Sequence, residues 1–123
     1  DRSIIIGYSF GGATALSVAG AELQLNGLKQ RCQGGLIGFS LGEGIQCAAA
    51  GLPEERYQLR DGRIKRAIAM NPITSLLFGE TGLSKIKIPT LIVASSADKT
   101  TPALAEQIAG FPKIPSPKWL VGF

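Results

Sequence analysis

The pattern Gly-x-Ser-x-Gly at residues 7–11 constrains the fold of this chain more than any other feature. It follows the strand-like residues Ser3–Ile6 and leads into the small residues of Gly11–Leu23. A short β-branched run before a segment of small residues predicts a buried parallel strand, a tight turn and a helix packed closely on the sheet. We expect Ser9 to occupy that turn, because glycines at positions 7 and 11 remove side chains that would collide there.

A serine at such a turn is a candidate nucleophile. It attacks at neutral pH only when a base lies within hydrogen-bond reach and a carboxylate orients that base. Asp98 is the candidate carboxylate, because it follows a predicted strand and comes after Ser9 in the chain. The backbone N–H of Phe10 is the candidate oxyanion donor.

The 123 residues contain no histidine that could serve as the base. One interpretation places the catalytic histidine beyond Phe123, after the last predicted strand, and we favour it. The alternative is a binding or scaffold domain that has the same fold but performs no hydrolysis. The chain also starts and stops on strand-like residues, so we expect a partial domain, truncated at both ends.

Three other polar residues have to be considered as catalytic candidates. Asp61 precedes a predicted strand and Glu80 lies in a predicted cap segment, so we interpret both as solvated loop charges. Ser40 lies in a second Gly-x-Ser-x-Gly match, residues 38–42, but only Leu36 and Ile37 precede that match as strand-like residues. We interpret the second match as chance in a chain with 16 glycines.

Charge and hydropathy exclude several classes of partner. The net charge of +4 comes from 13 basic and 9 acidic residues, and the one basic cluster, at 60–66, is typical of a solvated strand entry. We therefore expect no nucleic-acid partner. No apolar run reaches the ~18 residues that span a bilayer, so we expect no transmembrane segment.

Cys32 and Cys47 are the two cysteines of the chain. They have no CxxC spacing and no histidine beside them, so we expect no metal site, and nothing in the sequence indicates a cofactor. They are either two buried thiols or one disulfide. We favour the disulfide, which is typical of periplasmic or secreted proteins.

The order of elements predicts an α/β fold with a mostly parallel sheet and helices on both faces. Strands are expected at 63–71, 90–95 and 118–123, and helices at 43–52 and 102–109. Residues 26–44 are predicted to be irregular and 54–62 to be a charged loop. Residues 72–87 are a possible cap or lid, whose Leu76, Leu77 and Phe78 could line an acyl pocket or pack under a loop.

The chain resembles α/β-hydrolases of the dienelactone hydrolase-like and platelet-activating-factor acetylhydrolase-like group. The resemblance rests on Ile6–Gly12, on Arg63–Pro72 and on Lys87–Ala94 followed by Ser96–Asp98. It implies the C-terminal part of an α/β-hydrolase fold and an acyl-enzyme on Ser9, with Asp98 orienting a histidine. Dienelactone hydrolases carry cysteine as the nucleophile. The serine found here instead implies an esterase or lipase-like enzyme that acts on small or lipid-like esters.

Overall fold

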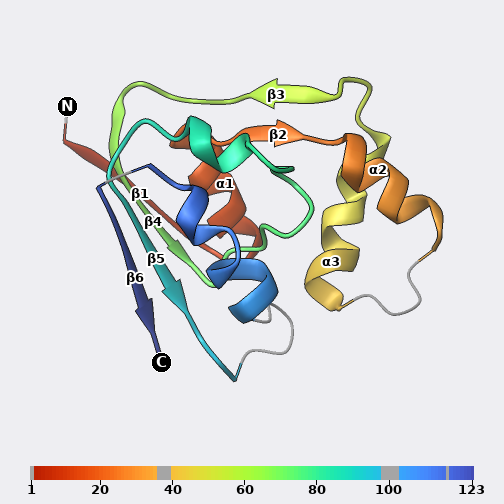
Figure 1. Ribbon diagram of the computed structural model, residues 1–123. Coiled ribbons are helices and arrows are strands. Elements are labelled where there is room, and N and C mark those ends of the chain that lie inside the picture. The colour runs from red at the N-terminus through yellow and green to blue at the C-terminus, as the bar shows by residue number, and fades with distance from the viewer. Residues whose placement is uncertain (1, 36–39, 98–102, 116) are drawn as a thin grey trace.

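A four-stranded parallel sheet forms one side of the structure (Figure 1). The computed structural model describes residues 2–35, 40–97, 103–115 and 117–123. The strands lie in the order β1-β4-β5-β6, and each pair of neighbours is parallel. Their bounds are Ser3–Tyr8 for β1, Ile64–Met70 for β4, Thr90–Ala94 for β5 and Lys118–Gly122 for β6. The predicted α/β class and the four predicted strands are confirmed.

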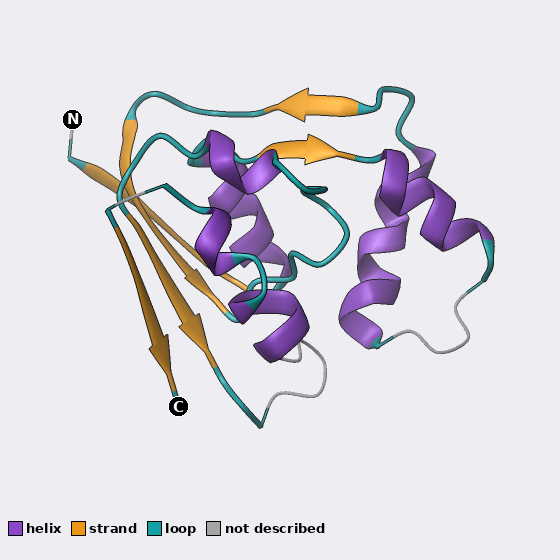
Figure 2. Ribbon diagram, viewed as in Figure 1, coloured by secondary structure: helices purple, strands orange, loops and turns teal. Residues whose placement is uncertain are grey.

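The described helices cover only one face of this sheet, contrary to the expectation of helices on both faces (Figure 2). The reason is the order of the strands. From β1 to β4, β5 and β6 the chain always adds the next strand on the same side. Connections between parallel strands are right-handed, so connections that advance in one direction all lie on the same face.

Helix α1 (Phe10–Val18) ends earlier than the sequence predicted. Gly20 has a φ of +122°, which ends the helical path, and residues Glu22–Gln24 form strand β2. Strand β2 pairs antiparallel with β3 (Arg56–Gln58), which lies in the segment predicted to be a loop. The predicted helix through Leu23 and the predicted loop at 54–62 are therefore wrong in these residues.

The segment after β2 is more regular than predicted. Residues Asn26–Gln33 form helix α2, within the range predicted to be irregular. Helix α3 (Leu41–Gln46) and the 3₁₀ turn η1 (Cys47–Gly51) confirm the short helix predicted near 43–52. A disulfide joins Cys32 of α2 to Cys47 of η1. This bond fits an oxidising compartment, whereas a periplasmic or secreted location stays a prediction.

Three further short elements complete the described chain. They are the 3₁₀ turn η2 (Gly82–Lys85), the π-helical turn η3 (Leu104–Ile108) and the 3₁₀ turn η4 (Phe111–Lys113). Turn η2 belongs to the predicted cap segment, where Ile73, Phe78 and Ile86 are buried in the core. Among the described residues no helix is long and apolar enough to cross a membrane.

A buried carboxylate joins three of these segments. Glu106 of η3 is fully buried and accepts hydrogen bonds from the backbone N–H groups of Thr74 (2.6 Å) and Ser75 (2.8 Å) and from the Ser75 hydroxyl (2.7 Å). The amide of Gln46 in α3 also donates to it, and Gln46 Oε1 accepts from the N–H groups of Leu76 and Leu77. These bonds hold the loop after β4 between α3 and η3.

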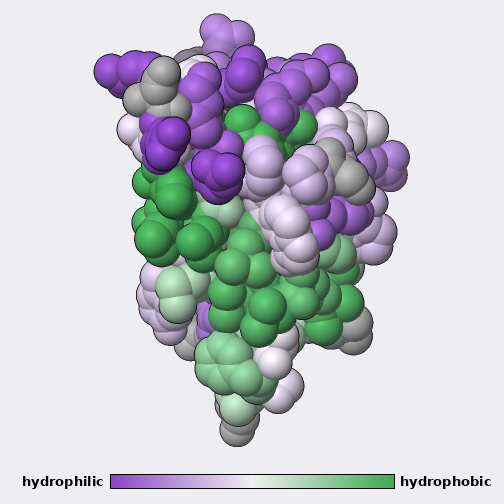
Figure 3. All heavy atoms as spheres, turned by 90° about the vertical axis from the view of Figure 1, so that its left-hand side faces the viewer, coloured by the Kyte–Doolittle hydropathy of each residue, from purple (hydrophilic) through white to green (hydrophobic). Residues whose placement is uncertain are grey.

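The outer face of the sheet is apolar and exposed (Figure 3). Side chains alternate along each strand, and the register places eight large apolar side chains in two rows across the four strands. One row is Ile6, Ile68, Leu91 and Trp119, and the other is Tyr8, Met70, Val93 and Val121. The exposed fraction is 64% at Tyr8, 62% at Ile6 and 54% at Trp119. Parallel sheets are almost always covered on both faces, so this face favours association.

Replacing Glu106 by glutamine should destabilise the protein. The glutamine would keep one oxygen for the N–H groups of Thr74 and Ser75, but its NH2 group would face the side-chain NH2 group of Gln46, donor against donor. A buried donor without an acceptor costs about 3 kcal/mol when the lost partner was charged. We expect a loss of this size in urea unfolding. Glu80→Gln, at an exposed position, is the control and should change little. Equal stability of E106Q and the parent would contradict the role assigned to this network.

The double variant Ile6→Lys, Trp119→Lys should reduce self-association of the 123-residue chain. Charges on the outer face oppose burial of its two apolar rows, so we expect less light scattering and later elution in size-exclusion chromatography. The control is Leu41→Lys, which removes a leucine that is 63% exposed on α3. A sharp, cooperative and monomeric melting transition of the unmodified chain would contradict the expectation.

Candidate active site

Ser9 lies at the turn between β1 and α1, at the carboxyl edge of the sheet. Its φ of 58° and ψ of −119° are values that residues other than glycine rarely adopt. Its backbone N–H donates to the carbonyl oxygen of Met70 in β4 (2.9 Å), and its own carbonyl accepts from Gly12 N (2.9 Å). The strand, turn and helix occur in the order that the sequence predicted. Positive φ at such a residue marks stored backbone strain, which is frequent at functional sites.

The glycines around Ser9 have unequal roles. A Cβ atom at Gly7 would lie 1.9 Å from the carbonyl oxygen of Gly11, and one at Gly12 would lie 2.9 Å from Cα of Pro72. A Cβ atom at Gly11 would meet nothing within 4 Å. The expectation that Gly7 and Gly11 both relieve collisions is therefore wrong for Gly11. Position 11 faces outward, whereas position 12 packs against the loop after β4.

Asn71 is a residue that sequence reasoning missed. It follows β4, it is buried, and its φ of 46° makes it the other non-glycine residue with positive φ in the described chain. Its backbone N–H donates to the carbonyl oxygen of Val93 (2.7 Å). The signal in the sequence was the pair Asn71-Pro72 at a strand end, since asparagine is enriched in this conformation.

A cavity of about 350 Å³ lies at the carboxyl ends of the strands. Residues at the ends of all four strands line it, namely Tyr8, Met70, Asn71, Ser95, Ala97 and Phe123. Ser9 follows Tyr8 directly but does not itself line this cavity. In parallel sheets ligands bind outside the carboxyl ends of the strands, so the cavity is at the position where a substrate is expected.

The two other predicted site residues are Phe10 and Asp98. Phe10 is the first residue of α1, and the N–H groups of a first helical turn have no acceptor within the helix. Asp98 lies outside the described residues. The preceding strand β5 ends at the same edge as β1, two strands away, which is about 10 Å at the usual strand spacing.

Asp61 lies at the opposite edge of the sheet. It precedes β4, and its carboxylate accepts hydrogen bonds from the Arg63 side chain at 3.0 Å and 2.7 Å. Hydrogen bonds from the side chain and backbone of Arg63 lower the pKa of Asp61 from 3.8 to about 2. Asp61 is thus a paired surface charge, which agrees with the interpretation made from the sequence.

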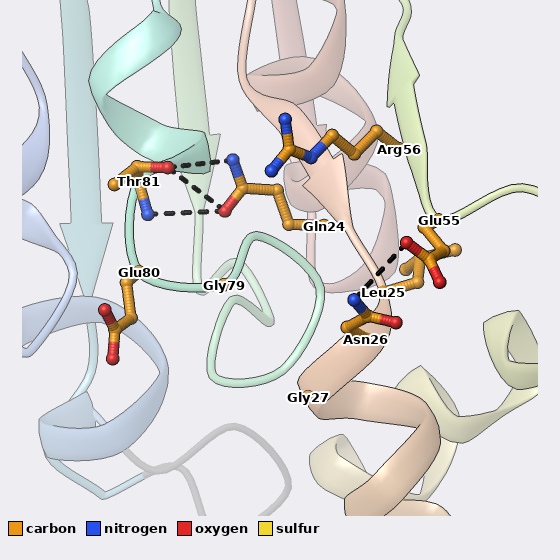
Figure 4. Close-up of a pocket in the computed structure, with 9 residues that line it drawn as sticks. All are labelled: Gln24, Leu25, Asn26, Gly27, Glu55, Arg56, Gly79, Glu80 and Thr81. Atoms are coloured by element: carbon orange, nitrogen blue, oxygen red, sulfur yellow. Dashed lines mark hydrogen bonds between the residues drawn. The ribbon is translucent and has the colours of Figure 1, made fainter.

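Glu80 belongs to a polar cavity built by β2, the start of α2, β3 and the loop at 79–81 (Figure 4). In this cavity Gln24 hydrogen-bonds to Thr81, and Asn26 donates to Glu55. None of its residues comes from the carboxyl ends of β1, β4, β5 or β6. The cavity is therefore separate from Ser9.

Ser40, from the second Gly-x-Ser-x-Gly match, has a structural role. It caps helix α3: its hydroxyl accepts from the backbone N–H of Glu43 (3.2 Å), and the Glu43 carboxylate accepts from the Ser40 N–H (3.2 Å). This reciprocal pair satisfies two N–H groups at the helix start. A serine occupied in this way is not placed as a nucleophile.

Comparison with known proteins does not assign the chain to a family. No protein-family model matches the chain, and no curated protein sequence matches it. Within the described residues no three histidine, cysteine or acidic side chains form a group that could hold a metal ion. The geometry around Ser9 is therefore the main indication of function.

Replacement of Gly7 and of Gly11 by alanine should have opposite effects. The Gly7→Ala methyl group collides with backbone that cannot move without separating α1 from β1, so we expect a loss of at least about 3 kcal/mol of stability or no soluble protein. Gly11→Ala meets open space and lowers the backbone entropy of the unfolded chain, so stability should rise by up to about 1 kcal/mol. Urea unfolding measures both. Similar losses in the two variants would contradict the assignment.

Proposed function

We propose that Ser9 is the nucleophile of a serine carboxylester hydrolase with an α/β-hydrolase fold. One observation carries the proposal: a serine with φ of 58° stands on a strand-to-helix turn at the carboxyl edge of a parallel sheet. That geometry lifts a hydroxyl away from the sheet toward a substrate. The resemblance of the segments around Ser9, Arg63–Pro72 and Lys87–Ala94 to α/β-hydrolases supports it.

In the proposed reaction, the Ser9 hydroxyl oxygen attacks the ester carbonyl carbon, and a histidine takes its proton. The backbone N–H of Phe10 donates to the oxyanion of the tetrahedral intermediate. The alcohol leaves with the proton from the histidine, and an acyl group remains on Ser9. Water then attacks the acyl-enzyme by the same route, releasing the acid. Asp98 orients the histidine in both halves.

The proposal requires a histidine from outside the 123 residues, since the sequence contains none. The proposed substrates are small or lipid-like esters. The cavity at the ends of the four strands, beside Tyr8 and Asn71, has room for part of such a molecule. Without a histidine in reach, the same fold would be a binding or scaffold domain.

A fluorophosphonate probe tests the proposal on the full-length protein that carries this sequence. We expect the probe to label Ser9, and Ser9→Ala should abolish labelling and lower kcat for ester hydrolysis at least about a thousandfold. Ser40→Ala is the matched control, because Ser40 has the same flanking glycines but caps α3. Mass spectrometry locates the label.

Two results would contradict the proposal. Labelling that persists in Ser9→Ala would place the nucleophile elsewhere. A folded full-length protein that is not labelled at all would favour the non-catalytic domain.

A further inference from the structure

A second cavity, of about 310 Å³, starts at Phe10 and extends along α1. Its α1 wall is formed by Phe10, Ala13, Thr14, Ser17 and Val18, which share one face of the helix. These positions span about 12 Å of helix axis. The two chain neighbours of Ser9 each line one cavity: Tyr8 lines the cavity at the strand ends and Phe10 lines this one.

The lining of the second cavity is mainly apolar, and the hydrogens of its two hydroxyl groups are already donated to backbone carbonyls. The Thr14 hydroxyl donates to the Phe10 carbonyl (3.3 Å), and the Ser17 hydroxyl donates to the Ala13 carbonyl (3.0 Å). No charged side chain lines it. A polar group buried there without a partner would lose its hydrogen bonds to water, so an apolar ligand fits best.

The wall opposite α1 is held in place. It includes Ala49 of η1, Leu52 directly after η1, and Leu77 from the loop after β4. The disulfide at Cys47 ties η1 to α2, and the buried Gln46 accepts a hydrogen bond from the Leu77 N–H (3.0 Å). Such a wall keeps the cavity open without a ligand, as in preformed small-molecule sites.

We propose that this cavity binds the unbranched apolar acyl chain of the ester that Ser9 attacks. The inference rests on the proposed function. Phe10 connects the proposed reaction site to the cavity. Its backbone N–H is the proposed oxyanion donor, and the same residue lines the end of the cavity. The acyl carbonyl would therefore lie where the cavity begins. After the first step the acyl group remains bound to Ser9, whereas the alcohol has left. The acyl chain is therefore the part of the substrate that needs a binding site beside α1.

Binding of cis-parinaric acid, a fluorescent unbranched fatty acid, tests the site without catalysis. The full-length Ser9→Ala protein is titrated with and without Ala49→Phe, which fills the cavity. We expect Kd to rise at least about tenfold, since each methylene kept out of an apolar site costs about fourfold in affinity. Ala105→Phe adds the same ring at an exposed alanine of η3, outside the cavity, and should leave Kd unchanged.

Leu52→Asp is the second variant. It sets a carboxylate in the same wall at a side chain that is 38% exposed, so it is tolerated even where Ala49→Phe is not. Circular dichroism reports the folding of each variant. In the active protein, A49F and L52D should lower the ratio of kcat/KM for p-nitrophenyl octanoate to that for the acetate, and A105F should not.

The outcomes separate this inference from the function on which it rests. Equal parinarate affinity in the parent, A49F and L52D would overturn the acyl site, whether or not Ser9 is labelled by a fluorophosphonate. Loss of parinarate binding in A49F and L52D, with no labelling of Ser9, would support the apolar site and overturn the hydrolase. Loss of binding together with Ser9 labelling and the shifted ester ratio supports both.

Discussion

The close approach of Gly7 to the carbonyl oxygen of Gly11 is the contact on which the candidate site depends. A Cβ atom at position 7 would lie 1.9 Å from that oxygen, so any side chain there would push α1 away from β1. With α1 this close, the chain must reverse within one residue, and Ser9 takes a positive φ. The bond from Ser9 N to the Met70 carbonyl then fixes the turn to the neighbouring strand.

The one-way order of the strands determines the rest of the architecture. Because the four strands are parallel, all their carboxyl ends lie at one edge, where Ser9 follows β1 and where Asn71 and Ser95 line one cavity. The same order places the described helices on one face. The two apolar rows on the other face are the consequence, and they explain why association is the expected behaviour of the chain.

Buried polar contacts, rather than the sheet, hold the loops around the site. Glu106 accepts from the N–H groups of Thr74 and Ser75, and Gln46 accepts from those of Leu76 and Leu77. The loop after β4 thereby joins η3 to α3. Since α3 leads into η1 and its disulfide, the loop beside Asn71 and the wall of the α1 cavity are parts of one network.

The sequence by itself determined the four strands of the parallel sheet, the turn at Ser9 and the start of the small-residue helix, because β-branched runs, Pro72 and the glycine spacing act on neighbouring residues. It also favoured the disulfide. Only the tertiary structure decided that Glu22–Gln24 and Arg56–Gln58 pair, that position 12 and not 11 must be glycine, and that Asn71 joins the site. The buried role of Glu106 was likewise invisible. Each of these depends on partners distant in the chain, such as Thr74 for Glu106, and no local pattern encodes which distant groups will meet.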